Sequence, residues 1–261
     1  MQAAYIAASG MEAQQRALEV TAHNLANMNS TAFNKRTLLT TTLAYQDFSR
    51  VGTLTSSAGT VKPAGIQIGM GVKMAGVARL LNQGPAIQSD DPFHLMIEGP
   101  GYFQITLPSG EIGYTRDGSF TVNAEGQMVT QQGYLLEPNI TIPANVTSVT
   151  INPNGDVSVK IDGQTQPQVV GTITLANFVN PGGLTAIDNN TFLETVASGG
   201  PNIAAPGQPG FGTLLQNALE GSNVNAVTEM TGLIRIQQAY EMDAKVQQTA
   251  SRMGEASVNI V

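Results

Sequence analysis

Apolar positions are most regular near the end of the chain, from Ser222 onward. Ser222, Asn223 and Asn225 are residue types that cap helix starts, and from there to Met253 the only glycine is Gly232 and proline is absent. Two apolar stripes have helical spacing: Met230, Leu233, Gln237, Tyr240 and Ala244 form one, and Ala239, Met242, Val246 and Met253 form the other. This pattern predicts one long helix that needs neighbours on two faces, and about thirty residues make a rod of ~45 Å.

The first thirty residues carry a second helical pattern. Its seam positions alternate in steps of four and three residues, and they are Ala4, Ala7, Met11, Gln14, Leu18, Thr21, Leu25 and Met28. The helix should end near Asn27–Thr31, where most residues prefer caps and turns.

Two interpretations of these terminal helices stay open. They form either a helical hairpin within one chain or the contacts of a polymer, because half of the first seam is Ala, Gln and Thr and buries little apolar area in a lone pair. In the polymer, we expect the subunit interface to include Met11, Leu18, Leu25, Met28, Phe33, Val224, Met230, Leu233, Ile234, Tyr240, Val246 and Met253.

Residues 35–76 are predicted to form an extended arm. The segment is rich in Thr, Ser and Gly, which favours neither a packed helix nor a simple loop. Spaced apolar residues still run along it, as in a segment that lies on another surface, and we expect its contacts at Tyr45, Phe48, Ile66 and Ile68.

Alternation of period two dominates the middle of the chain, for instance at Val157, Val159 and Ile161. Turn signals such as Asn154-Gly155 and Asp162-Gly163 separate these runs. The spacing predicts an antiparallel β domain of the sandwich or barrel type. Residues 199–212, rich in Gly and Pro, are interpreted as a return linker, after which Leu214 and Leu215 lead into the last helix.

The predicted fold class is therefore α+β, with a β domain and an arm inserted between two terminal helices. The expected divisions are residues 1–34 for the first helix, 35–76 for the arm, 77–213 for the outer β domain and 214–261 for the second helix. The two helices together form a coiled-coil-like inner domain in this prediction.

Composition narrows the possible partners. The 261-residue chain has 12 Lys and Arg against 19 Asp and Glu, and a net charge of −7 argues against a nucleic-acid surface. The absence of cysteine excludes disulfides and thiolate chemistry. Neither a Sec-type signal peptide nor an apolar run long enough for a membrane span is apparent, so these signals alone favour the cytoplasm.

Candidate chemistry is sparse. The two histidines, His23 and His94, have no second His or Cys at metal-ligand spacing. Asp90, Asp91 and Glu98 resemble a glycosidase pair only loosely, and carboxylates before a proline more often form a turn. Asn152–Asp156 is typical of a hairpin more than of a calcium loop, and Arg116 beside Asp117 is interpreted as fixing the turn before Gly118. We expect no enzyme activity, no cofactor and no metal.

Three blocks of sequence, in order, resemble the rod and hook subunits of the bacterial flagellum. The first is Asn24-Leu25-Ala26-Asn27 followed by Thr31-Ala32-Phe33, where Ala32 replaces a common glycine, and the last is Ser222-Asn223-Val224-Asn225 with Gln237-Gln238-Ala239-Tyr240-Glu241. The middle block is similar to the family's shared β domain through Gly99, Gly101, Phe103, Tyr114, Thr115, Arg116, Gly118 and Phe120.

The resemblance implies a subunit of a helical tube, and it is strongest toward distal rod subunits. In such a tube the helices surround a protein export channel, the β domain faces outward, and the assembly transmits torque from motor to hook. Implied partners are further copies of the chain, proximal rod proteins, hook or hook-junction proteins and the L-ring and P-ring bushings, without membrane insertion. The implied location is the basal body, in the rod that crosses the periplasm to the outer membrane, reached by flagellar export without a cleaved signal peptide. A proximal rod or hook subunit and a carbohydrate-binding β module remain the alternatives.

Overall fold

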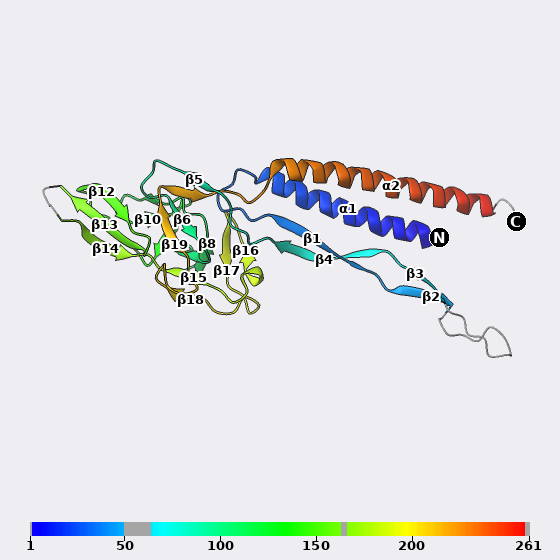
Figure 1. The fold of residues 1–261 in the computed structure, drawn as a ribbon, viewed down its shortest axis with the longest axis horizontal. Coiled ribbons are helices and arrows are strands. Elements are labelled where there is room, and N and C mark those ends of the chain that lie inside the picture. Colours follow the sequence, from blue (N-terminus) through cyan, green and yellow to red (C-terminus); the bar gives the residue numbers. More distant parts are fainter. Residues whose placement is uncertain (1, 50–63, 163–165, 259–261) are drawn as a thin grey trace. The chain divides into compact units, whose positions relative to one another are not determined.

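The computed structural model describes residues 2–49, 64–162 and 166–258, which form two compact units. The helical unit comprises Met1–Ala26, Arg36–Arg79 and Asn225–Val261, and the β unit comprises Asn27–Lys35 and Leu80–Val224. The chain is α+β, with a helix at each end and a β-rich middle, as the sequence predicted (Figure 1). Residues 50–63 of the predicted arm and Gly163 of a predicted turn lie outside the described residues.

Both terminal helices are present in the helical unit. Helix α1 covers Gln2–Ala26 and α2 covers Ala226–Val258, and they run antiparallel, side by side (Figure 1). The sequence predicted that this helix begins at Ser222, but α2 begins four residues later, at Ala226. Asn225 is the residue that caps it, because its side-chain Oδ1 accepts a hydrogen bond from Thr228 N at 3.2 Å.

The predicted arm is a two-stranded ribbon in its described part. Its strands are β1 (Arg36–Thr42), β2 (Tyr45–Ser49), β3 (Ile66–Gly69) and β4 (Val72–Arg79), and β1 pairs with β4 and β2 with β3, all antiparallel. Backbone hydrogen bonds from Leu43 N to Gly71 O and from Met70 N to Ala44 O join the two pairs. The segment is therefore ordered by its own ladder and by contacts of β1 and β4 with α1.

The β unit consists of short antiparallel strands. One sheet runs in the order β16-β17-β8-β7-β11-β10-β9, with β15 joining β7 to β18, and a second is β12-β13-β14. Their bounds are β7 Tyr102–Thr106, β8 Ile112–Thr115, β9 Thr121–Val122, β10 Met128–Val129, β11 Leu135–Glu137, β12 Val146–Ile151, β13 Asp156–Ile161, β14 Gln168–Thr172, β15 Leu175–Asn177, β16 Thr185–Ala186, β17 Thr191–Leu193 and β18 Asn202–Ala204, with a 3-10 turn at Pro181–Gly183.

Four further strands belong to the β unit, two before β7 in the sequence and two after β18. They are β5 (Ala86–Gln88), β6 (Leu95–Glu98), β19 (Thr213–Gln216) and β20 (Ala218–Glu220), and they pair as β19 with β6 and β20 with β5. The predicted boundary at residue 213 is thus too early, because Leu214 is buried in the core and does not lead into a helix. The predicted linker likewise contains β18, and the boundary at residue 77 shifts to Arg79.

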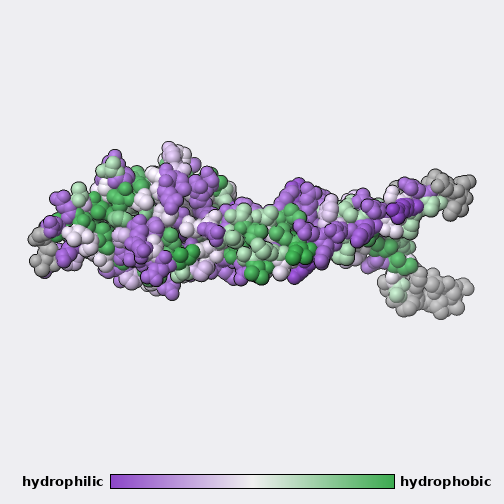
Figure 2. Space-filling model, turned by 90° about the horizontal axis from the view of Figure 1, so that it is seen from above, coloured by the Kyte–Doolittle hydropathy of each residue, from purple (hydrophilic) through white to green (hydrophobic). Residues whose placement is uncertain are grey.

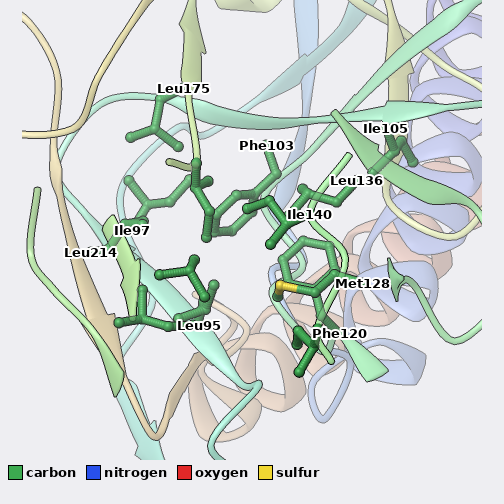
Figure 3. Close-up of a cluster of buried hydrophobic side chains, with 14 of the residues drawn as sticks. Leu95, Ile97, Phe103, Ile105, Phe120, Met128, Leu136, Ile140, Leu175 and Leu214 are labelled. Atoms are coloured by element: carbon green, nitrogen blue, oxygen red, sulfur yellow. The ribbon is translucent and has the colours of Figure 1, made fainter. Parts of the chain in front are cut away.

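Buried aliphatic and aromatic side chains fill the β unit (Figure 3). Phe103 and Phe120 pack edge to face with ring centroids 5.0 Å apart, and Leu95, Ile97 and Met128 are among the side chains around them. A second cluster contains Tyr102, Tyr114, Ala176, Phe178, Leu184 and Phe192. The β unit therefore has its own core, which makes it a rigid support for the loops discussed below.

Candidate assembly surfaces

Helix α2 exposes most of its large apolar side chains. Met253 is 63% exposed and Ile234 is 55% exposed, and Met230, Tyr240 and Val246 are exposed as well. Leu233 is partly buried. Figure 2 shows apolar residues at the surface of the molecule between hydrophilic ones. Apolar surface of this kind is typical of a protein that associates with a partner.

The interface residues predicted on α1 are less accessible. Met11, Leu18 and Leu25 are partly buried, in agreement with the contacts that α1 makes with α2 and the ribbon. In the β unit, Met28 is exposed and Val224 is partly buried, whereas Phe33 is only 5% exposed. Phe33 is therefore a core residue of the chain itself and has little surface to offer another copy.

The arm residues form a second exposed apolar surface in the helical unit. Tyr45 and Phe48 on β2 and Ile66 and Ile68 on β3 are all exposed, Phe48 by 54%. Among the described residues neither edge of this ribbon pairs with a further strand, and its apolar side chains are exposed, so it is open to pairing with another chain.

A buried polar contact fixes how α1, α2 and the ribbon pack. Asn24 is buried on α1, and its Nδ2 donates to Glu229 Oε2 of α2 at 3.2 Å and to Arg36 O at 2.8 Å. Its Oδ1 accepts from Arg36 N at 2.9 Å. Because a shift of either helix would leave these buried groups unpaired, Asn24 sets one register.

Arg116 bonds to several separate segments of the β unit. Its Nε donates to Glu220 Oε2 at 2.8 Å, and the two side chains are 11% and 4% exposed. Nη1 donates to Gly99 O at 3.2 Å and to Gly101 O at 3.0 Å, while the guanidinium lies 5.9 Å from the Tyr102 ring centre. The prediction was that Arg116 fixes the turn before Gly118, whereas its side chain joins segments far apart in sequence, at Glu220, Gly99 and Gly101.

The other residues of the β-domain motif lie around this arginine. Gly99 and Gly101 have φ values of +109° and +142°, which favour glycine, and a Cβ at Gly118 would collide with Leu95 O. Thr115 Oγ1 donates to Asn190 O at 3.1 Å and accepts from Asp117 N at 3.0 Å. Burial, with the Glu194 carboxylate second, raises the pKa of Tyr114 to about 12.

Sequence reasoning missed how segments 31–35 and 220–223 are held together within the β unit. Ala32 N donates to Glu220 O at 2.8 Å and Lys35 N donates to Asn223 Oδ1 at 2.6 Å. Asn223 Nδ2 also donates to Leu80 O and Asn82 O. Ala32 has a φ of +54°, a backbone conformation that favours glycine. We call this the 31–35/220–223 contact.

Two of the candidate chemical residues, Asp91 and His94, have structural partners. Asp91 Oδ1 accepts from Phe93 N at 2.9 Å, as in a turn, and His94 Nδ1 lies 2.7 Å from Ser89 Oγ. The Asn152–Asp156 stretch forms the hairpin between β12 and β13. His23 is exposed. Within residues 2–49, 64–162 and 166–258, no three His, Asp or Glu side chains gather as a metal site would require. No helix in this part of the chain is long and apolar enough to cross a membrane.

Three protein-family models match the chain in order. They are described as flagella basal body rod protein (residues 5–33), flagellar hook protein FlgE/F/G D1 domain (96–159) and flagellar basal body rod FlgEFG protein C-terminal (215–260). These matches fall on the two helices and the β-domain motif described above. The chain belongs to the flagellar basal-body rod protein family, which confirms the resemblance seen in the sequence.

Relatives define its place within the family. The chain is 53% identical to the flagellar basal-body rod protein FlgG of Caulobacter vibrioides, over 98% of both chains. It is 42% identical to FlgG of Borreliella burgdorferi, over 97% of this chain and 96% of that protein. Its identity to FlgF of Caulobacter vibrioides is 33%, over 98% and 96%. The chain is therefore a FlgG-like member of the rod family.

Proposed function

We propose that this chain is a structural subunit of the flagellar distal rod. The rod is a straight helical tube that transmits torque from the motor to the hook and surrounds the protein export channel. The observation that carries this proposal is the apolar surface of the helical unit in a FlgG-like chain, since Met230, Ile234 and Met253 are more than half exposed. Because roughly half of each of these side chains is already covered within the chain, burial of the rest by a neighbouring copy contributes about 1–1.5 kcal/mol per side chain.

Each part of the chain has its own role in this tube. Helices α1 and α2 form a coiled-coil-like inner domain that surrounds the channel, with copies packed along Met11, Leu18, Leu25, Leu233, Tyr240 and Val246. The β unit is the outer domain, and the ribbon lies between neighbouring copies through Tyr45, Phe48, Ile66 and Ile68. Contacts at several radii resist bending, which a drive shaft requires.

The proposed partners follow from this position. They are further copies of the chain, proximal rod proteins below, hook or hook-junction proteins above, and the L-ring and P-ring bushings around the β units. The chain reaches the rod through the flagellar export route and acts without a cofactor or catalytic site.

Electron microscopy of the purified full chain at rising concentration tests this function. The expected result is a straight, stiff tube whose helical reconstruction has the terminal helices inside and the β units outside. A curved tube would assign the chain to the hook. Persistent monomers, even after addition of rod and hook subunits, would contradict a polymer function and favour a monomeric binding module.

A further inference from the structure

A notch opens in the helical unit where α1, α2 and the ribbon meet. Its volume is about 300 Å³, and its walls include Ile6, Ala7 and Gly10 of α1, Val72 of β4, and Asp243 and Val246 of α2. That space equals the liquid volume of about ten water molecules, which is room for a long side chain. Apart from Asp243, these lining side chains are apolar or absent.

The carboxylate of Asp243 lies directly over Gly10. A Cβ at position 10 would be 2.8 Å from Asp243 Oδ2 and 3.2 Å from its Cγ, so glycine leaves the space that the carboxylate occupies. Asp243 is partly buried, and within the described residues its carboxylate has no hydrogen-bond or ion-pair partner. A carboxylate at an apolar wall favours an occupant with an aliphatic stem and a cationic head.

The helical unit exposes side chains of this chemistry. Lys73 on β4 and Arg235, Lys245 and Arg252 on α2 are exposed and form no ion pair among the described residues. Lys245 stands two positions from Asp243, so it points away from the notch on the same helix. A second copy of the chain can deliver such a side chain from outside.

We propose that the Gly10–Asp243 notch is a docking site for a basic side chain of a second copy of this chain. The stem packs against Ile6, Val72 and Val246, and the ammonium or guanidinium group pairs with the Asp243 carboxylate. This inference rests on the proposed function, because it needs copies to meet, and it adds one defined contact to the assembly.

A glycine substitution tests the shape of the site. Gly10→Ala places a methyl group against the Asp243 carboxylate and displaces it, which narrows the notch. Alanine is the better helix former, so circular dichroism should show a helix content no lower than that of the unaltered chain. We expect the concentration needed for assembly, measured by sedimentation of polymer, to rise about tenfold. Gly232→Ala is the matched control, since a Cβ at that α2 position meets no atom within 4 Å, and it should leave the assembly concentration unchanged.

Charge changes test the chemistry of the occupant. Asp243→Asn keeps the shape and should also raise the assembly concentration, whereas Glu241→Gln, a neutralised exposed carboxylate on α2, should not. Asp243→Lys should block assembly, and combination with Lys73→Glu, Arg235→Glu, Lys245→Glu or Arg252→Glu should restore it for the one residue that enters the notch.

The outcomes separate the inference from the proposed function. If the unaltered chain forms no polymer even after rod and hook subunits are added, the proposed function fails and the notch has no second copy to bind. If the unaltered chain assembles and neither Gly10→Ala nor Asp243→Asn changes the assembly concentration, only the docking site is refuted. Failure of all four charge exchanges to rescue Asp243→Lys would also refute it, because the occupant would then not be one of these basic side chains.

Discussion

Replacement of Arg116 by methionine should destabilise the β unit strongly. Methionine fills much of the space of the arginine stem but donates no hydrogen bond, so the Glu220 carboxylate, 4% exposed, loses its cationic partner. Carbonyls of Gly99 and Gly101 lose their donors as well. Removal of one member of a buried ion pair costs about 3–5 kcal/mol, because the other charge stays buried without compensation.

The cost is large relative to the total free energy of unfolding of a domain, about 5–15 kcal/mol. Arg116→Lys should recover only part of it, since a single ammonium cannot donate at once to Glu220 and to both carbonyls. Glu220→Gln should cost less than Arg116→Met, because a neutral amide is cheaper to bury and its oxygen still accepts from Gly84 N.

Urea unfolding monitored by near-ultraviolet circular dichroism measures these differences. Tyr102 and Tyr114 lie in the β unit, and the chain has no tryptophan to obscure their signal. Together, Arg116→Met and Glu220→Gln should cost less than the sum of their separate effects, because the double variant leaves no unpaired charge. A loss below about 1 kcal/mol for Arg116→Met, or strict additivity, would refute the argument that the pair joins these loops.

Three further predictions address other parts of the chain. Ultraviolet titration should show that Tyr114 ionises near pH 12 in the folded protein, and ionisation together with the exposed tyrosines would contradict this. Because its pKa is raised above the usual 10, the stability that Tyr114 contributes is present below pH 10 and is lost as the pH rises toward 12. Asn24→Ala should lower the stability of the helical unit in urea unfolding by about 2–4 kcal/mol, because Glu229 and Arg36 both lose the Asn24 side chain as a hydrogen-bond partner. A loss as small as that at an exposed site would exclude a register role for Asn24. Tyr45→Ser with Phe48→Ser should leave the monomer's unfolding midpoint unchanged and make the polymer bend more in electron micrographs; an equally stiff polymer would count against the arm's role.

The two helices could be predicted because local periodicity encodes them. The predicted start of α2 at Ser222 is four residues too early. Ser222, Asn223 and Asn225 are all residue types that cap helices, but only Asn225 caps α2 in the structure. Asn223 instead bonds to the backbone of Lys35 and Leu80, partners far away in sequence. Local capping signals do not distinguish these two uses.

The contacts of the β unit were harder to predict for the same reason. Leu214 looks like part of a helical approach, but its strand pairs with Leu95–Glu98, more than a hundred residues earlier. Arg116 and Glu220 are likewise 104 positions apart. The motif around Arg116 was found through family resemblance, whereas its partner carries no sequence signal at all.

The 31–35/220–223 contact has a consequence for how the helices meet. α1 ends at Ala26 and α2 begins at Ala226, so the end of α1 and the start of α2 are separated by most of the chain until this contact forms. Once it forms, the two helices are tethered by a few residues, and their effective concentration rises to roughly the millimolar range of short linkers. With this contact in place only a short loop remains to be closed between the two helices, so a seam with many small and polar residues suffices for pairing.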